Sequence, residues 1–301
     1  MNPMSGTYGA AMPGYAPMKQ RGRGRSFNCM AVVVALTVPP FLYMVMSAVL
    51  SFSWQYNNPG ICNMIKWVGL AFVLFLGYFA YAAWRRYSRG EDNPSWYVYL
   101  FVSCFVAWIW ACASGSYNFG KNMQPYYDVM NLNTYPSVDP ASYKGQQLMD
   151  AGRIIFTADS RLDLQKSMGF RNLDIYCVAP VVTGTDPMAA YDFWAVGKNC
   201  CSGHTADFAC GEFNNPMAHS GLRLMTDADR PYFRLAVQQA EAAYNIKASH
   251  PVFLQWMQDP ISEINAYQDD GFKTYLFGVF LFIALNCFFV VMMVIMFSKF
   301  A

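Results

Sequence analysis

Four cysteines are the residues best suited to covalent chemistry. They are Cys177, Cys200, Cys201 and Cys210, and the last three fall in the segment CCSGHTADFAC. An even set of cysteines in an oxidising compartment favours disulfides. Adjacent cysteines rarely reach disulfide geometry without strain, so a bond between Cys200 and Cys201 is disfavoured. We therefore expect Cys177 to bond to either Cys200 or Cys201, with Cys210 taking the other.

A zinc site is the alternative use of these thiols, because His204 stands among them and zinc accepts thiolate and imidazole ligands. The spacing matches no familiar zinc pattern, and an oxidising compartment favours disulfides. His219 and His250 are isolated in the sequence. We therefore expect no metal site and no cofactor.

Catalytic signatures are not evident. The sequence has no nucleophile elbow, HExxH motif or phosphate-binding glycine loop. Asp159 with Asp163, and Asp227 with Asp229, are interpreted as loop carboxylates and helix caps. The sequence therefore predicts no catalytic residues and a non-enzymatic protein, with a membrane-tethered lumenal enzyme as one alternative.

The composition is that of a membrane protein. Of the 301 residues, 55% are hydrophobic and only 13% are charged, which is not typical of a soluble domain. The formal net charge of +2 provides no general field that would attract nucleic acid. The lipid bilayer and other membrane proteins are therefore the expected partners, and nucleic acid is not.

Four apolar segments are long enough to cross a bilayer, which takes about 20 helical residues. They cover residues 29–52, 65–84, 96–116 and 274–297, and none has an acidic or basic residue beyond its first two positions. Pro39 and Pro40 should kink the first. Asn286, in the fourth, is expected to make an interhelical polar contact of about 0.6–2 kcal/mol.

Basic residues predict the orientation, because they resist translocation. They precede the first span, follow the second and follow the fourth: Lys19, Arg21, Arg23, Arg25, Arg85, Arg86, Arg89 and Lys299. Four crossings place all of them on one side. The sequence thus predicts an integral protein of the plasma membrane or an endomembrane, with cytosolic N- and C-termini.

The domain plan follows from these spans. Residues 1–27, rich in Gly, Pro, Met and Tyr, are expected to be a disordered cytosolic tail. Within this tail, Tyr15 and Met18 fit the tyrosine-x-x-bulky pattern of sorting motifs, which also occurs by chance. Residues 28–116 hold three spans and residues 117–272 form a lumenal or extracellular domain. Residues 273–301 hold the fourth span and a short cytosolic tail.

The outer segment is too long for a structureless loop, so it should fold. β-branched and aromatic runs bounded by Gly, Pro, Asp and Asn predict strands at residues 153–158, 174–182, 191–199 and 221–225. A helix should begin near Thr226 or Asp229 and run to about Lys247, with one apolar face. The predicted fold class is a four-span α-helical membrane protein with a disulfide-braced mixed α/β outer domain.

Two further segments of this outer region have weaker patterns. Residues 117–142, rich in Asn, Pro and Tyr, are expected to be extended or looped. Residues 250–267 are interpreted either as a juxtamembrane element or as part of the domain core.

The plan resembles that of the tetraspanins: four spans, a short first outer loop, a long second one and a cysteine doublet in it. Where that family has CCG, this sequence has CCSG at residues 200–203. The inserted Ser202, the preceding Cys177 and the predicted strands depart from the largely helical tetraspanin loop. The resemblance implies a non-enzymatic organiser that packs against partner membrane proteins and presents its outer domain for recognition. An accessory subunit of a channel or transporter is the leading alternative, and a homo-oligomer is compatible with either.

Overall fold

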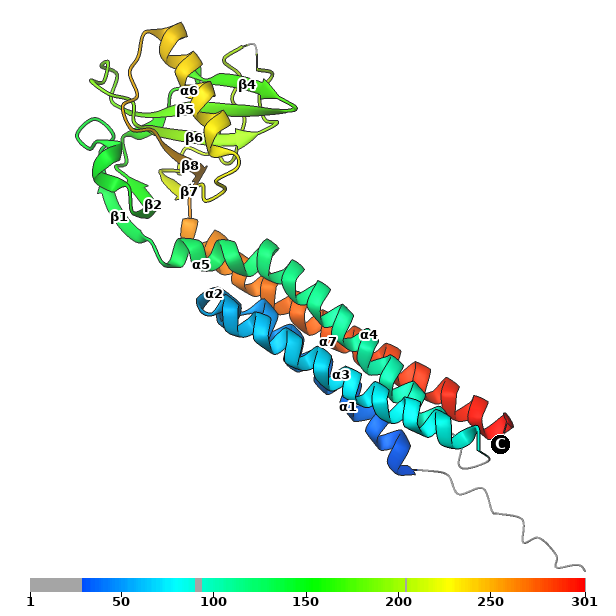
Figure 1. Cartoon of the computed structure of the whole chain (residues 1–301). Coiled ribbons are helices and arrows are strands. Elements are labelled where there is room, and N and C mark those ends of the chain that lie inside the picture. The colour runs from blue at the N-terminus through cyan, green and yellow to red at the C-terminus, as the bar shows by residue number, and fades with distance from the viewer. Residues whose placement is uncertain (1–28, 90–93, 204, 301) are drawn as a thin grey trace, which may run out of the picture.

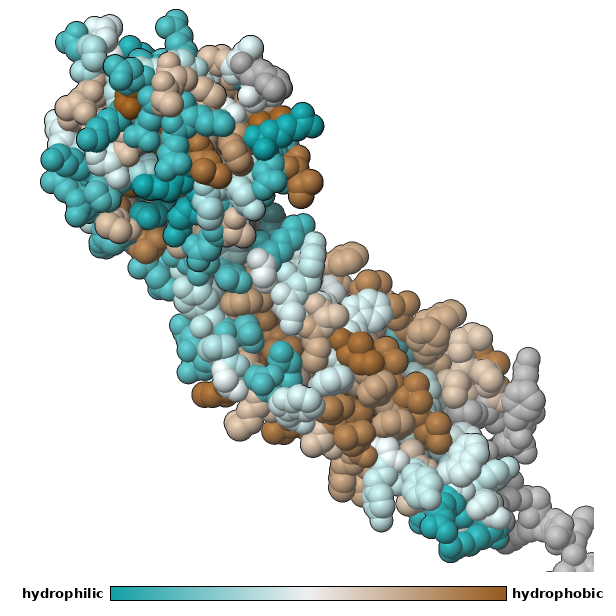
Figure 2. Space-filling view, turned by 45° about the horizontal axis from the view of Figure 1, so that its top comes forward, coloured by the Kyte–Doolittle hydropathy of each residue, from teal (hydrophilic) through white to brown (hydrophobic). Residues whose placement is uncertain are grey.

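The computed structural model describes residues 29–89, 94–203 and 205–300, with side chains described through Met296. A long helical bundle is joined end to end to a sheet domain (Figure 1). Tyr15, Met18 and the arginine-bearing tail lie outside the described residues. Apolar side chains gather over the bundle, whereas the sheet domain presents a largely hydrophilic surface (Figure 2).

Four helices of the described chain are long and apolar enough to cross a membrane. They are α1 (Cys29–Ser51), α3 (Pro59–Tyr87), α4 (Ser95–Asn118) and α7 (Pro260–Phe300), and the short α2 (Ser53–Asn57) lies between α1 and α3. A π-helical segment, η1 (Phe119–Met123), and α5 (Gln124–Met130) continue α4 without a break. The predicted spans are confirmed as helices, and three of them are longer than predicted.

Helices α1 and α4 form the centre of the bundle. Each of them packs against both α3 and α7. Small residues let the helices approach closely: a Cβ on Gly278 of α7 would lie 2.5 Å from the Tyr43 hydroxyl of α1. The Tyr43 ring stacks on Phe282 at 4.8 Å between centroids, and its hydroxyl lies 3.1 Å from Ser114 Oγ of α4. Tyr43 therefore joins three helices.

The strands of the described chain form one mixed sheet in the order β1-β2-β7-β8-β6-β5-β3, with β4 also paired to β5. Pairs β1–β2 and β6–β8 are parallel and the remaining pairs are antiparallel. The strands are β1 (Asn133–Val138), β2 (Ala151–Phe156), β3 (Ser160–Leu162), β4 (Met168–Asn172), β5 (Asp174–Thr183), β6 (Phe193–Lys198), β7 (Ser220–Arg223) and β8 (Val252–Met257). The predicted mixed α/β domain is confirmed.

The sheet has an apolar core on each face. On one face, Ile154, Phe193 and Leu254 are fully buried beside the cysteine-bearing loop. Helix α6 (Arg230–Tyr244) covers the other face through Phe233, Val237 and their neighbours (Figure 1). Alternate side chains of a strand point to opposite faces, so both faces of the long strand β5 are buried.

The expectation that residues 117–142 are extended or looped is wrong for the first part of that range, which is helical through Met130. Polar contacts explain the continuation. Asn122 Nδ2 donates to Asn118 Oδ1 at 2.8 Å, and Asn118 Nδ2 donates to the Gly271 carbonyl of α7 at 2.9 Å. Because α7 begins at Pro260, α4 and α7 pack together well beyond their apolar segments.

Residues 250–267 hold the central strand β8 and the first turns of α7, so the domain-core interpretation is correct for their first half. Val252, Leu254 and Trp256 are buried in the sheet core. The predicted helix after Asp229 is confirmed, although it ends at Tyr244 rather than near Lys247. Asn245 ends it in the left-handed conformation (φ 51°) that commonly terminates helices.

Asp192 is a buried carboxylate, 2% exposed, that connects three segments of the domain. Its Oδ2 accepts from the Gly145 backbone N–H at 2.9 Å. Its Oδ1 accepts from the Ser249 and His250 N–H groups at 2.9 and 3.1 Å. An asparagine at this position would replace one carboxylate oxygen with an amide NH₂ group. That group would face a backbone N–H, so two hydrogen-bond donors would oppose each other.

We predict that Asp192→Asn destabilises the outer domain by about 1–3 kcal/mol, the typical cost of a buried donor left unsatisfied. Thermal unfolding of the full chain in detergent, followed by near-UV circular dichroism, measures this loss. Asp186→Asn, at an exposed loop position, is the control and should leave the transition unchanged. Equal transitions for both variants would contradict the role of Asp192.

Candidate functional site

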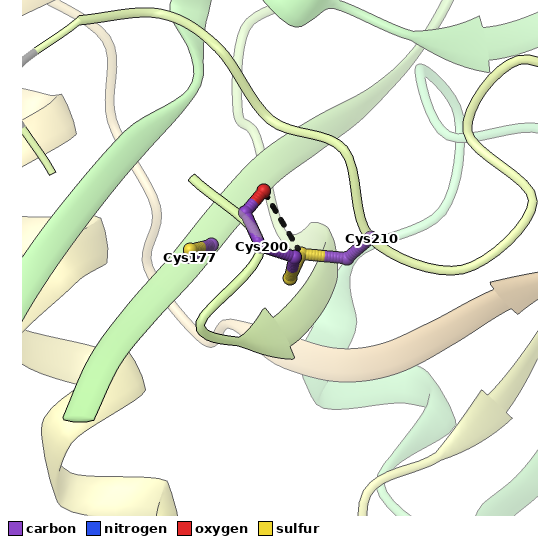
Figure 3. Close-up of side chains that lie close together, drawn as sticks. All are labelled: Cys177, Cys200 and Cys210. Atoms are coloured by element: carbon purple, nitrogen blue, oxygen red, sulfur yellow. Dashed lines mark hydrogen bonds between the residues drawn. A yellow bond between two sulfur atoms is a disulfide. The ribbon is translucent and has the colours of Figure 1, made fainter. Parts of the chain in front are cut away.

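The two disulfides join Cys177 to Cys201 and Cys200 to Cys210, with Cα separations of 5.9 and 5.2 Å. This is one of the two pairings that the sequence left open, and the disfavoured Cys200–Cys201 bond is not formed. Cys177 lies beside the Cys200–Cys210 bridge (Figure 3). The Cys177–Cys201 bridge fastens the loop after β6 to β5, and the Cys200–Cys210 bridge closes that loop on itself. A disulfide typically stabilises by about 2–4 kcal/mol.

Two glycines make room for these bridges. Strand register places Gly169 of β4 and Gly197 of β6 directly opposite Cys177 of β5. A Cβ on Gly197 would lie 2.6 Å from Cys210 Cβ. A Cβ on Gly169 would lie 2.6 Å from the Cα of Gly203. The loop can therefore lie against the sheet only because both positions flanking Cys177 lack a side chain.

Sulfur atoms of Cys177, Cys200 and Cys210 lie within 4.8 Å of one another. Each of these atoms is already bonded in a disulfide, so none is a thiolate that can bind zinc. His204 lies outside the described residues. His219 Nδ1 lies 2.9 Å from the Ser160 carbonyl, a contact that accounts for this ring without a metal. The three sulfur atoms therefore belong to structural disulfides.

Asp207 orders the loop between the cysteines. Its two carboxylate oxygens accept from the Ser202 backbone N–H at 3.1 and 3.0 Å. Hydrogen bonds from Ser202 hold the pKa of Asp207 below its ordinary value, because they favour the charged form. A carboxylate whose pKa is lower in the folded protein than in the unfolded chain stabilises the fold. This contribution is complete at pH values above the pKa in the unfolded chain, and it is lost as the pH falls through the pKa in the folded protein. The Asp207 carboxylate therefore holds the loop fully at neutral pH and more weakly in acid.

Asn286 makes a contact between α7 and α1. Its Nδ2 donates to the Ala35 carbonyl at 3.1 Å, and the side chain is 5% exposed. Ala35 is four residues before Pro39, which has no N–H to complete that turn of α1. A carbonyl released in this way inside an apolar bundle needs another donor. Asn286 supplies this donor. Its amide in α7 therefore replaces the hydrogen bond that Pro39 removes from α1.

A groove opens beside the same prolines on the surface of the bundle. It encloses about 810 Å³ and is lined by α1 residues between Leu36 and Met46, with Phe72 of α3 and Ile283 of α7 at its sides. Pro40, in its lining, removes the N–H that would donate to the Leu36 carbonyl. Thr37 Oγ1 donates to the Val33 carbonyl at 2.9 Å, so the hydroxyl proton is engaged within α1. The groove is apolar, with hydrogen-bond acceptors near one end.

No family model, no curated protein and no solved structure matches this chain. The resemblance to tetraspanins stays a prediction from the sequence.

We predict that Gly197→Ala lowers the stability of the outer domain by about 1–3 kcal/mol, the usual cost of an added methyl group in a packed site. Gly120→Ala is the matched control, because no atom lies within 4 Å of a Cβ there. Thermal unfolding measures the effect, and peptide mapping without reductant reports the disulfides. Equal stability of the two variants would refute the proposed close packing.

Asn286 and Pro39 are expected to be energetically coupled. Asn286→Leu alone should cost about 0.6–2 kcal/mol, because it leaves the Ala35 carbonyl without a donor. In a Pro39→Ala background the helix restores its own donor, and the cost should fall toward zero. Pro40→Ala is the control, since it restores a donor for Leu36 instead. Reversible unfolding in mixed micelles measures this double-mutant cycle, and equal coupling to both prolines would contradict the pairing.

Proposed function

We propose that this chain is a non-enzymatic integral membrane protein that recognises or organises partner proteins through its outer domain and helices. The sheet domain lies at one end of the bundle, and Arg85 and Arg86 end α3 at the other (Figure 1). By the positive-inside rule the arginines are cytosolic and the domain is lumenal or extracellular. The disulfides fit an oxidising compartment.

The observation that carries the proposal is the rigid junction between bundle and domain. Strand β8 ends at Met257 and α7 begins at Pro260. On the other connection, α5 ends at Met130 and β1 begins at Asn133. Neither join has the length of a flexible linker.

Side chains reinforce the junction. Val129 of α5, Leu222 of β7 and Ile264 of α7 are buried together. The domain is therefore held at a fixed height and angle on the bundle. A surface held in one orientation loses little freedom on binding, which favours recognition of a partner in the same membrane.

The groove beside Pro39 and Pro40 favours a second candidate function, an accessory subunit of a channel or transporter. A partner's transmembrane helix could seat an apolar side chain between Phe72 and Ile283. A hydroxyl or amide of that helix would find acceptors at Leu36 and Thr37. This role requires stable contact along the spans, whereas recognition through the outer domain does not.

Photo-crosslinking in native membranes tests the proposed function. Photoreactive residues are placed at exposed Tyr143 and Met217 of the domain, and at Thr37 in the groove. Each of them captures a protein only if that protein lies beside it. We expect domain positions to give discrete protein adducts, and a groove adduct to appear as well if the chain is an accessory subunit.

A short Gly-Ser spacer between Gln258 and Asp259 should reduce the domain adducts severalfold, because it loosens the junction. The same spacer between Asp186 and Pro187, in an exposed loop, is the control. Domain adducts unaffected by the junction spacer would contradict the importance of rigidity, and no protein adduct at any position would contradict the proposed function.

A further inference from the structure

Leu173 is the most unusual surface residue of the described chain. It lies at the tip of the β4–β5 hairpin, between the paired residues Asn172 and Asp174, and its side chain is 99% exposed. Its backbone is in the left-handed region, with φ 60°. Leucine is disfavoured there, and glycine or asparagine is the ordinary choice. Folding therefore gains nothing from a leucine at this position.

Leu173 differs from the other non-glycine residues that have positive φ. Among the described residues, the other non-glycine residues with positive φ are Ser137, Asn199 and Asn245. Two of them are asparagines, which tolerate this conformation well. Leu173 alone combines a bulky apolar side chain, a costly backbone conformation and complete exposure. Strain of this kind persists where the surrounding structure enforces it and is characteristic of functional sites.

Hydrogen bonds and a disulfide hold the base of the hairpin. Asn199 Nδ2 donates to Asp174 Oδ1 at 2.9 Å, and the Ile175 N–H donates to Asn199 Oδ1 at 2.9 Å. The Asn199 N–H donates to the Ile175 carbonyl at 2.8 Å. The Cys177–Cys201 disulfide joins the same two segments next to these bonds. The leucine is thus presented on a fixed base, which lowers the entropy that a partner must remove.

The hairpin tip belongs to the side of the sheet opposite the strands that contact the helices. Strands β4 and β5 lie toward one edge of the sheet, and β1 and β2 form the other. The β1–β2–β7 side contacts α5 and α7, and β4 and β5 lie in the part of the domain away from those helices (Figure 1). Leu173 therefore lies outside the contacts between the domain and helices α5 and α7, and it is open to solvent.

We infer that Leu173 is the anchor of a protein-binding surface, and that it inserts into an apolar pocket of a folded partner on the domain's side of the membrane. This inference rests on the proposed function. A single buried leucine surrounded by polar contacts is a common binding anchor. Lipid insertion uses several apolar residues with basic neighbours, whereas Leu173 is flanked by the exposed Arg171 and the acidic Asp174.

A set of variants in the full chain tests the anchor. A photoreactive amino acid at exposed Asn172 reports what binds at the tip in native membranes. Leu173→Gly and Leu173→Asn should cut the yield of the protein adduct at least about tenfold, because each removes the buried apolar contact. Leu173→Met should largely keep it. Leu235→Gln, at an apolar position of α6 that is 40% exposed, is the matched control and should have no effect.

Stability separates binding from folding. Leu173→Gly should leave the melting temperature of the domain unchanged or higher, since glycine adopts positive φ readily. A lower melting temperature, an adduct that persists without the leucine, or an adduct to lipid would overturn the inference. If Tyr143 and Met217 still capture proteins in any of those cases, only the anchor fails. If no position captures a protein, the proposed function fails with it.

Discussion

An apolar helix must satisfy its own backbone hydrogen bonds, and the rest of this structure depends on how the bundle meets that constraint. Pro39 breaks the pattern in α1, and Asn286 of α7 repairs it at the Ala35 carbonyl. The repair fixes the position of α7 against α1 near the middle of the bundle. Tyr43, stacked on Phe282 and seated against Gly278, fixes the same pair of helices closer to the domain.

The same principle continues into the domain. Asn118 and Asn122 extend the helix beyond the apolar segment of α4, because they hydrogen-bond to each other and to α7. The two helices therefore remain packed together up to the sheet domain. Inside that domain, Asp192 collects backbone N–H groups from separate loops. The glycines opposite Cys177 admit the disulfide loop. Each of these features limits how the exposed surface of the domain can move relative to the bundle.

The sequence predicts the parts of this fold that depend on composition and short-range pattern. Apolar length predicted the four helices, and β-branched runs predicted strands β2, β5, β6 and β7. The helical extension beyond residue 116 was missed because polar residues form it through contacts with a distant helix. Strand β8 was ambiguous, since an apolar run of that length suits a core strand or an interfacial segment equally.

The site residues divide in the same way. The four disulfide cysteines follow from compartment and count, but their pairing depends on strand register, which places Gly169 and Gly197 beside Cys177. Asn286 stood out as a polar residue in a span, yet its partner is a carbonyl that only the fold brings near. Leu173 gave no signal, because neither its exposure nor its positive φ can be inferred from residue type.

The central claim is that four apolar helices cross a bilayer and hold the rigid sheet domain on one face of it. Protease added outside sealed vesicles whose lumenal or extracellular face is outermost tests this most directly, with antibodies against the two ends of the chain as readout. The account predicts cleavage within exposed loops of residues 117–272, while the segment around Arg85 and Arg86 is protected until detergent is added. Cleavage near those arginines in intact vesicles, with the sheet domain spared, or release of the whole chain without detergent, would contradict it.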